Sequence, residues 1–228
     1  MYKELLKKIA IFKDLSDETL SFIEKNLEIQ PYHKNDIIFS ETDQAEGVFF
    51  VKTGTVRLTK SDDTGKEIIV CLKKSGDLFA EVSLFAPENS TYPATAHMIQ
   101  DGEVLFLKSA ALEREIFTNP ELGIEIIRFM SNQLRNFTVT LRDIALLDVY
   151  NKTVSTLDRL AKDFGEENQD GLQIELPLTV QEFANIIGAR RESVSRVFSK
   201  LKNENIIRIN EKKIVISNMC KFCSLDKV

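Results

Sequence analysis

Hydrophobic residues follow a strand-like pattern in the first half of the chain. Between residues 29 and 107 they occur in short β-branched and aromatic runs, separated by turn residues at Gly47, Gly54, Gly65 and Gly76. Glycines at such intervals are typical of the turns in antiparallel sheets. The strands predicted on this basis are 37–39, 48–51, 56–59, 67–72 and 104–107. Many short strands at roughly even spacing indicate a β-sandwich or a jelly-roll barrel.

Helical periodicity surrounds this strand-rich region. Two short amphipathic helices, 5–12 and 15–27, are predicted before the strands, and a third, 109–117, after them. Pro120 then interrupts the pattern, because proline lacks the amide that a continuing helix needs. The longest helix is predicted to begin at this proline and to run to Asp148.

A narrow apolar stripe runs along the predicted long helix. Its members are spaced alternately three and four residues apart: Ile127, Met130, Leu134, Phe137, Leu141 and Ile144. This heptad spacing is that of a coiled-coil seam, and most residues between are polar. A helix of this length spans about 40 Å, so we expect it to be the dimer axis between two identical chains. The alternative is a core helix packed inside its own chain.

Asp148 stands where the next apolar residue of the seam is due. A helix with a different apolar face resumes over 151–164, followed by a polar loop over 165–171. Aspartate is a favoured N-cap, so Asp148 is predicted to be both a hinge and the cap of the next helix. The alternative is a charge buried within one continuous helix, although Leu147 and Val149 can bury there instead.

Residues 179–201 have the pattern of a helix-turn-helix. Thr179 and Glu182 form the capping box that begins a first helix, and Gly188 lies where a tight turn requires a positive φ. The small Ala184, four residues earlier, allows a second helix to cross closely. That second helix carries one apolar face, made of Val194, Val197 and Leu201.

The opposite face of the second helix is polar and basic. Its residues are Arg191, Glu192, Ser195 and Arg196, followed by Ser199, Lys200 and Lys202. Arginine can donate two hydrogen bonds to guanine, glutamate can accept one from cytosine, and serine or lysine can reach phosphates. Two β runs, 206–209 and 213–216, predict a hairpin that completes a winged helix. The alternative is an ordinary helical pair whose charges are only solvated.

Charge is distributed unevenly along the chain. Residues 1–148 contain 17 Lys and Arg against 24 Asp and Glu, a net charge of −7, whereas residues 149–228 contain 13 against 11, a net charge of +2. Within 180–213 there are 8 basic and 4 acidic residues, a net charge of +4. Because phosphate neutralisation is local, a basic segment in an acidic chain is compatible with binding nucleic acid there.

The composition also bears on the cellular compartment. No apolar run reaches 18 residues, and lysines interrupt the apolar residues at the start of the chain. This pattern argues against a transmembrane helix and a secretory signal, and we expect no membrane partner. Three cysteines cannot form an even set of disulfides. A reducing cytoplasm is therefore the expected location.

Together these motifs resemble the Crp/Fnr family of bacterial transcription regulators, the relatives of the cyclic-AMP receptor protein. The resemblance covers essentially the whole chain and is carried by GTVRL (54–58), SGDLFAEVSLF (75–85), LLDVYNKTVSTLDRLA (146–161) and LTVQEFANIIGARRESVSRVFSKLKNENII (178–207). It implies an α+β protein with an N-terminal cyclic-nucleotide-binding-like jelly-roll barrel, a long dimerisation helix and a C-terminal winged helix that binds a palindromic operator. The corresponding domains are 1–119, 120–148 and 149–228.

The resemblance also implies roles for individual residues. Arg191, Glu192 and Arg196 match the family's base-reading positions, and Ser195 matches a serine of the Fnr branch, whereas Arg190 departs from the Ser or Thr cap that is common there. The predicted DNA-binding residues are Thr179, Arg190, Arg191, Glu192, Ser195, Arg196, Ser199 and Lys200. With two-fold symmetry we expect an inverted repeat of TGA-like half-sites about one helical turn apart. RNA polymerase is an expected further partner.

The barrel departs from the relatives that bind cyclic AMP. Those proteins use Gly-Glu followed, after a loop, by Arg-Ser or Arg-Thr, whose arginine pairs with the cyclic phosphate. Here Ala80 and Glu81 are followed by Tyr92 and Pro93, so that charge-assisted contact is missing. We therefore predict no physiological cyclic-AMP binding, no cofactor and an unidentified effector. Phe79, Glu81 and Tyr92 are candidate pocket residues, with core packing as the alternative for Phe79.

Metal and enzyme chemistry have weak support in the sequence. An iron–sulfur cluster needs grouped cysteines, but Cys71 lies far from the CxxC pair Cys220 and Cys223, and a lone CxxC is a weak signal. His33 and His97 cannot form the histidine cluster of a cupin-type enzyme. The remaining alternative is a regulatory subunit acting on a partner protein, which the base-reading helix argues against. We expect no enzymatic activity.

Overall fold

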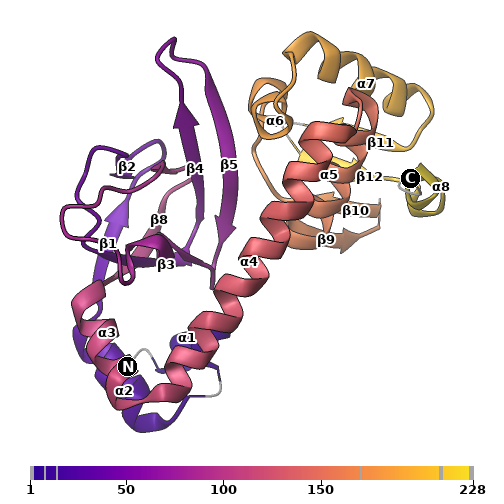
Figure 1. The fold of residues 1–228 in the computed structure, drawn as a ribbon. Coiled ribbons are helices and arrows are strands. Elements are labelled where there is room, and N and C mark those ends of the chain that lie inside the picture. The colour runs from indigo at the N-terminus through magenta and orange to yellow at the C-terminus, as the bar shows by residue number, and fades with distance from the viewer. Residues whose placement is uncertain (1–2, 8, 14, 170, 211–212, 226–228) are drawn as a thin grey trace. The chain divides into compact units, whose positions relative to one another are not determined.

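The computed structural model describes residues 3–7, 9–13, 15–169, 171–210 and 213–225. The chain forms two compact units, Met1–Arg135 and Asn136–Val228, and the boundary falls within one long helix. The first unit is rich in strands and the second is rich in helices (Figure 1). The predicted fold class, with a sheet-rich first half, a long helix and a C-terminal helix-turn-helix, is confirmed.

Two four-stranded antiparallel sheets build the first unit. Their orders are β1-β8-β3-β6 and β2-β7-β4-β5, so strands distant in sequence pair in space, as in a jelly roll. The strands are β1 (Glu28–Tyr32), β2 (Ile37–Phe39), β3 (Gly47–Thr53), β4 (Thr55–Ser61), β5 (Glu67–Lys74), β6 (Leu78–Phe79), β7 (Thr95–Met98) and β8 (Gly102–Lys108). The five predicted strands, which correspond to β2, β3, β4, β5 and β8, are confirmed.

Three strands were not predicted, and one predicted turn is wrong. β1 contains Pro31, which is tolerated because β1 lies at the edge of its sheet. β6 has only two residues, and β7, with the sequence TAHM, lacks the run of β-branched and aromatic residues that marks the predicted strands. Gly47 begins β3 instead of forming a turn, and a Cβ atom there would lie 2.5 Å from both the Leu107 carbonyl oxygen and the Phe106 ring. The close approach of β8 therefore requires glycine at this position.

The hairpin of β4 and β5 extends beyond the other strands of its unit (Figure 1). Asp62 organises its turn, because Oδ1 accepts hydrogen bonds from the amides of Thr64 at 2.9 Å and Lys66 at 3.0 Å. The Thr64 hydroxyl also donates to this oxygen, and it is the main cause that lowers the pKa of Asp62. Gly65 has a φ of 78°, which completes the predicted turn.

Apolar side chains of the first unit form two clusters. One joins β3 and β8 to the flanking helices and includes Phe12, Phe50 and Leu112. The other gathers side chains from both sheets around five aromatic rings, which belong to Phe39, Phe49, Phe79, Tyr92 and Phe106. Their contacting ring centroids lie 4.0 to 6.2 Å apart. The barrel interior is thus a packed aromatic core.

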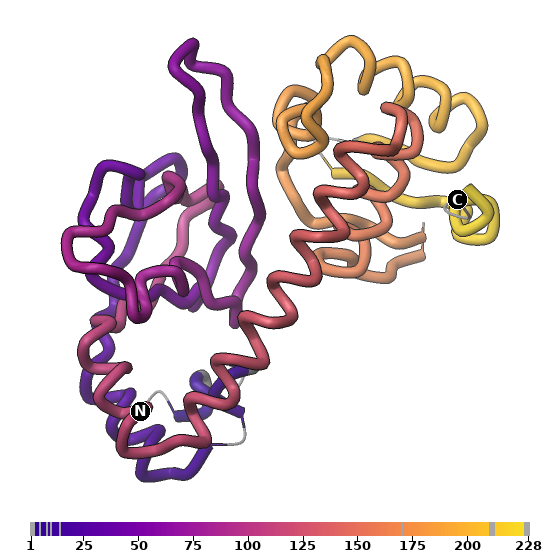
Figure 2. The backbone as a smooth tube through the Cα atoms, in the orientation of Figure 1, coloured from indigo at the N-terminus to yellow at the C-terminus, as the bar shows by residue number. Residues whose placement is uncertain are grey.

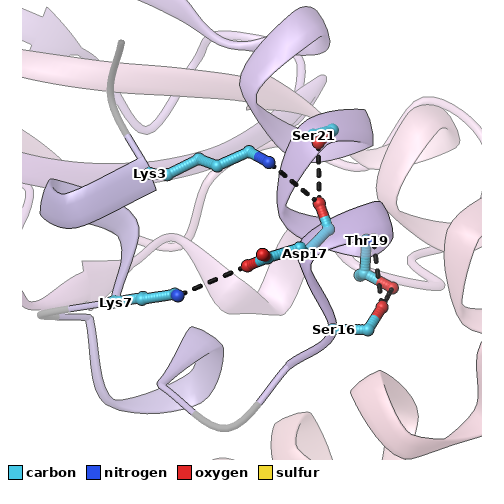
Figure 3. A network of polar contacts seen from close by, with 6 residues as sticks. All are labelled: Lys3, Lys7, Ser16, Asp17, Thr19 and Ser21. Carbon is cyan, nitrogen blue, oxygen red and sulfur yellow. Dashed lines mark hydrogen bonds and ion pairs between the residues drawn. The ribbon is translucent and has the colours of Figure 1, made fainter.

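Short helices cover one end of this unit: α1 (Lys3–Leu6), the 3₁₀ turn η1 (Ala10–Phe12), α2 (Asp17–Asn26) and α3 (Ser109–Thr118). The single helix predicted over 5–12 is wrong, since α1 and η1 are separate. Figure 3 shows how α1 and the residue that follows it, Lys7, contact the start of α2. Lys7 Nζ lies 3.3 Å from Asp17 Oδ1, and Lys3 Nζ donates to the Asp17 carbonyl oxygen at 3.3 Å. Ser16 caps α2 by accepting the Thr19 amide.

The long helix α4 (Pro120–Leu146) confirms the prediction and ends two residues before Asp148. Its first turns belong to the first unit, because Leu122 and Ile126 are buried in the cluster that contains Phe12. The six residues of the predicted seam, Ile127 to Ile144, are all exposed. The helix therefore begins as a core element and continues with an uncovered apolar stripe.

The second unit surrounds a four-stranded sheet of order β11-β12-β10-β9. Its elements are α5 (Val149–Phe164), β9 (Gly165–Asn168), β10 (Gly171–Ile174), α6 (Val180–Ile187), α7 (Arg191–Asn203), β11 (Ile207–Asn210), β12 (Lys213–Ile216) and α8 (Met219–Leu225). Figure 2 traces this path from α5 through the β9–β10 hairpin to α6 and α7, and back to the sheet. The predicted hairpin corresponds to β11 and β12, and residues 211–212 of its turn lie outside the described residues.

The polar loop predicted over 165–171 is wrong. Residues 165–168 form β9, and β10 begins at Gly171. β9 is an exposed edge strand with the sequence GEEN, so neither face shows an apolar alternation. Its pairing with β10 places Leu172 opposite Glu167 and Ile174 opposite Gly165. The tertiary sheet, and not local propensity, makes this segment a strand.

Candidate nucleic-acid interface

The helix-turn-helix begins with the predicted capping box. The Thr179 hydroxyl accepts the Glu182 amide at 3.1 Å, while Glu182 Oε2 accepts the Thr179 amide at 2.8 Å. Two amides that the helix leaves unpaired are satisfied by this exchange. Gly188 ends α6 with a φ of 63°, and the Ala189 amide donates to the Ala184 carbonyl oxygen at 3.0 Å. The sequence therefore fixes both ends of α6.

The two helices pack through a small apolar contact. Ala184 and Val194 are fully buried, as the close crossing of α6 and α7 requires. Phe183 and Phe198 meet edge to face, with ring centroids 4.9 Å apart. Phe198 was not among the apolar residues predicted for α7, although it lies four residues after Val194 and follows the same period. The other side of α7 is exposed.

The predicted DNA-binding residues are exposed, and most lie on α7. Arg191, Glu192, Ser195, Arg196, Ser199 and Lys200 are all exposed on this helix. Residues spaced by four share a helix face, so Glu192 and Arg196 form one row and Arg191, Ser195 and Ser199 form the adjacent row. The Arg196 guanidinium donates a long hydrogen bond, of 3.3 Å, to the Ser193 hydroxyl.

Two predicted residues lie before the recognition helix. Thr179 is exposed, but its hydroxyl is engaged in the capping box. Arg190 occupies the N-cap position of α7, and its side chain makes no capping hydrogen bond. An arginine cannot accept a hydrogen bond from the helix amides. Arg190 is exposed and stands at the positive end of the helix dipole, a location that suits an anion.

The sheet of the second unit packs against α5 and α7. Ile207, Ile214 and Ile216 of β11 and β12 are buried. Lys213 is held by an ion pair with Glu175, with Nζ 3.1 Å from Oε1, and this hydrogen bond is the main cause that lowers the pKa of Glu175. The arrangement of three helices, α5 to α7, with a hairpin after the second helix of the motif is a winged helix.

Known protein families match both the strand-rich and the helix-rich part of the chain. A model of the cyclic nucleotide-binding domain matches residues 29–119, and a model of the Crp-like helix-turn-helix domain matches residues 151–225. The Anaerobic regulatory protein of Bacillus subtilis is 30% identical over 86% of this chain and 82% of that protein. The chain belongs to the Crp/Fnr family.

Other known proteins are similar to this chain in sequence or in fold. A CRP-like cAMP-activated global transcriptional regulator of Mycobacterium tuberculosis is 25% identical over 94% of this chain and 95% of that protein. The structure of FixK2 from Bradyrhizobium japonicum superposes with a TM-score of 0.78, at 21% identity, covering 89% of this chain and 98% of that chain. The protein is accordingly a transcription regulator with a DNA-binding helix-turn-helix.

In this Crp/Fnr barrel, Tyr92, which was predicted to stand in place of the arginine of a cyclic-AMP site, turns into the aromatic core. It is 4% exposed, and its ring stacks on Phe39 with centroids 4.0 Å apart. The hydroxyl donates to the Gly47 carbonyl oxygen at 3.0 Å and accepts the Gly47 amide at 3.2 Å. Burial raises the pKa of Tyr92, so the phenol stays neutral. This side chain fastens β3 to the loop before β7.

The other candidate pocket residues of the Crp/Fnr barrel differ in their surroundings. Phe79 is fully buried and stacks on Phe49 within the aromatic core. Glu81 is half-buried at the start of the 3₁₀ turn η2 (Glu81–Ser83), preceded by Ala80, whose φ is 61°. The left-handed region is strained for alanine. Core packing, the alternative left open for Phe79, describes this residue, and Tyr92 packs in the same core although that was not predicted.

Cysteine and histidine residues are dispersed in the part of the chain that the structure describes. Cys71 is half-buried in β5, whereas Cys220 and Cys223 are exposed on α8. Burial, with the nearby Arg57, lowers the pKa of His97. Over these described residues, no three His, Cys, Asp or Glu side chains are grouped to hold a metal ion, and no helix is long and apolar enough to cross a membrane.

Proposed function

We propose that this transcription regulator acts as a homodimer on an inverted repeat with TGA-like half-sites. The observation that carries the proposal is the row of exposed polar side chains on α7, above all Arg191, Glu192 and Arg196. These are the residue types that read guanine and cytosine edges in the major groove. They stand on a helix whose buried face is fixed by Val194 and Leu201, so the reading face is pre-organised.

The uncovered stripe of α4 supports the homodimer. Leu134 is 68% exposed and Leu141 is 67% exposed. An apolar row of this length is unusual on the surface of a monomer, and its three-four spacing suits an identical helix. Two copies related by a two-fold axis would present two α7 helices to successive major grooves, about 34 Å apart. RNA polymerase is the further partner that we propose for the bound dimer.

We further propose that the barrel senses a signal other than cyclic AMP. A cyclic phosphate needs a guanidinium partner to offset the loss of water on binding. The equivalent position is occupied by Tyr92, whose hydroxyl is already bonded to Gly47. Admitting the nucleotide would disrupt the aromatic core.

In-vitro selection from a random duplex library tests the DNA-binding part of the proposal. Purified full-length protein, with and without reductant, is expected to enrich a TGA-type palindrome. Replacing Arg196 by Ala is expected to relax the preference at one base pair of each half-site, at a cost of about 1–3 kcal/mol per contact. The control is Lys25→Ala, which removes an exposed charge from α2 in the first unit. Unchanged selectivity in the Arg196 variant would refute its reading role.

Isothermal titration calorimetry with cyclic AMP tests the sensor part. We expect no binding at micromolar concentrations, because no arginine is present in the chain between Arg57 and Arg114 to pair with the phosphate. The matched control is the same titration of a duplex recovered by selection, which shows that the preparation is active. Micromolar affinity for cyclic AMP would overturn this part of the proposal without affecting the DNA-binding part.

A further inference from the structure

Lys200 of α7 is held by an aromatic ring from another helix. Its ammonium nitrogen lies 4.5 Å from the centroid of the Tyr150 ring, which belongs to the first turn of α5. Tyr150 is half-buried, whereas Lys200 is exposed. A cation over an aromatic face is attracted by the electrons of the ring. This contact joins α5 to α7 within the second unit.

The ring orients the ammonium group without neutralising its charge. Among the residues that the structure describes, Lys200 forms no ion pair with a carboxylate. The residue that could neutralise Lys200 is Glu204, because a carboxylate four residues later lies within reach of an ion pair on a helix. Burial and, secondarily, Glu204 raise the pKa of Tyr150, so the phenol is neutral at physiological pH. The positive charge of Lys200 is therefore fully available to an anion.

The position of Lys200 on α7 indicates which anion it meets. At 3.6 residues per turn, Lys200 lies about 40° around the helix from Arg196 and one turn further along. Its neighbour on that side is the half-buried Val197, so Lys200 marks the border between the exposed face and the face packed on α5. Base edges are contacted by the N-terminal part of a recognition helix. If α7 lies in the major groove, a lysine at the later border would face the wall of the groove, which is lined by phosphates.

We propose that Tyr150 is a positioning residue that holds Lys200 toward a backbone phosphate of the DNA. The pair would add affinity that does not depend on sequence, beside the base-reading row of Arg191, Glu192 and Arg196. This inference rests on the proposed DNA-binding function. Holding the long side chain in place lowers the entropy that phosphate binding would otherwise cost.

Fluorescence anisotropy with the full-length protein tests the pair. Two probes are used, a duplex recovered by selection and an unrelated duplex of the same length, each at several salt concentrations. The variants are Lys200→Met, Tyr150→Leu, the double variant and Tyr150→Phe, which keeps the ring. Lys25→Met, which removes a lysine from the first unit, is the control for net charge. Thermal unfolding of each variant checks that the fold is intact.

We expect Lys200→Met to weaken binding to both duplexes by a similar factor and to reduce the slope of log K against log salt by about 0.9 per subunit. Tyr150→Leu should weaken binding roughly two- to fivefold per subunit when Lys200 is present and have no further effect in the double variant. Tyr150→Phe should retain the coupling to Lys200, because the ring carries the interaction.

Several outcomes would overturn the inference. An unchanged salt slope in Lys200→Met would show that this lysine meets no phosphate. Tyr150 would not act through its ring on Lys200 if Tyr150→Leu reduced the DNA affinity equally with and without Lys200. The same would follow if Tyr150→Phe lost the coupling to Lys200. If the wild-type protein bound neither duplex, the proposed function itself would fail and the pair with it. The Arg196→Ala variant separates the two failures. If it binds DNA with relaxed selectivity, the proposed function holds, and a negative result at Lys200 concerns the pair alone.

Discussion

Asp148 shows how one residue ends one helix and begins the next. Its Oδ1 accepts the Asn151 amide at 2.8 Å, and its backbone is extended, with φ −73° and ψ 172°. The predicted N-cap of α5 is therefore confirmed, while its role as a hinge stays a prediction. The nearby Asp143 of α4 accepts a hydrogen bond from the Ser155 hydroxyl at 2.8 Å. One carboxylate thus starts α5 and another fastens α5 to the last turns of α4.

Replacing Asp148 by Ala should destabilise the second unit by about 1 kcal/mol, because the Asn151 amide would lose its acceptor. The measurement is denaturant unfolding of the full chain, together with hydrogen exchange at that amide. Asp148→Asn is the matched variant, since asparagine caps helices about as well. Equal protection of the Asn151 amide in the alanine variant and the wild type would show that the cap contributes nothing.

At the scale of the element, α4 lies in two different environments along its length. Leu122 and Ile126 are buried against the helices of the first unit. Phe129 is half-buried and carries the ammonium of Lys73 over its ring at 5.9 Å, although Lys73 is only 7% exposed. From Met130 onward the apolar residues of the seam are exposed, and this surface is the one that we propose for a second copy.

Leu134→Glu should separate the proposed dimer, because it places a carboxylate in the middle of the apolar seam and opposite its own copy. Sedimentation velocity at micromolar concentration is expected to give a dimer for the wild type and a monomer for this variant. Asn132→Glu is the control, since Asn132 is exposed on the opposite side of the heptad. A monomeric wild-type protein, or a dimer that tolerates Leu134→Glu, would contradict the proposed dimer axis.

At the scale of the whole molecule, two separately packed units share one helix. The first unit has its own aromatic core, and the second has its own sheet with α5 to α7 around it. Within the second unit, Arg159 donates to the Thr140 hydroxyl at 2.9 Å, which adds to the link between Asp143 and Ser155. A change in the packing of the α4 seam would therefore be transmitted to α5, the type of two-state coupling that we propose for signal transfer.

Local features of the sequence were sufficient to predict several elements and the candidate interface. The capping box of Thr179 and Glu182, the positive φ of Gly188 and the N-cap of Asp148 each depend on a few adjacent residues. The heptad of α4 and the polar row of α7 depend on a helical period. These features are encoded by spacing alone, so they could be predicted without knowledge of any distant contact.

Tertiary structure decided the features that depend on residues far apart in the chain. β9 is a strand because it pairs with β10, and Gly47 is required because Phe106 and Leu107 approach it from β8. The packing of Tyr92 against Phe39, and of Lys200 against Tyr150, likewise joins segments that are distant in sequence. Such contacts form only when sheets and helices pack, so they cannot be predicted from the periodicity of a local segment.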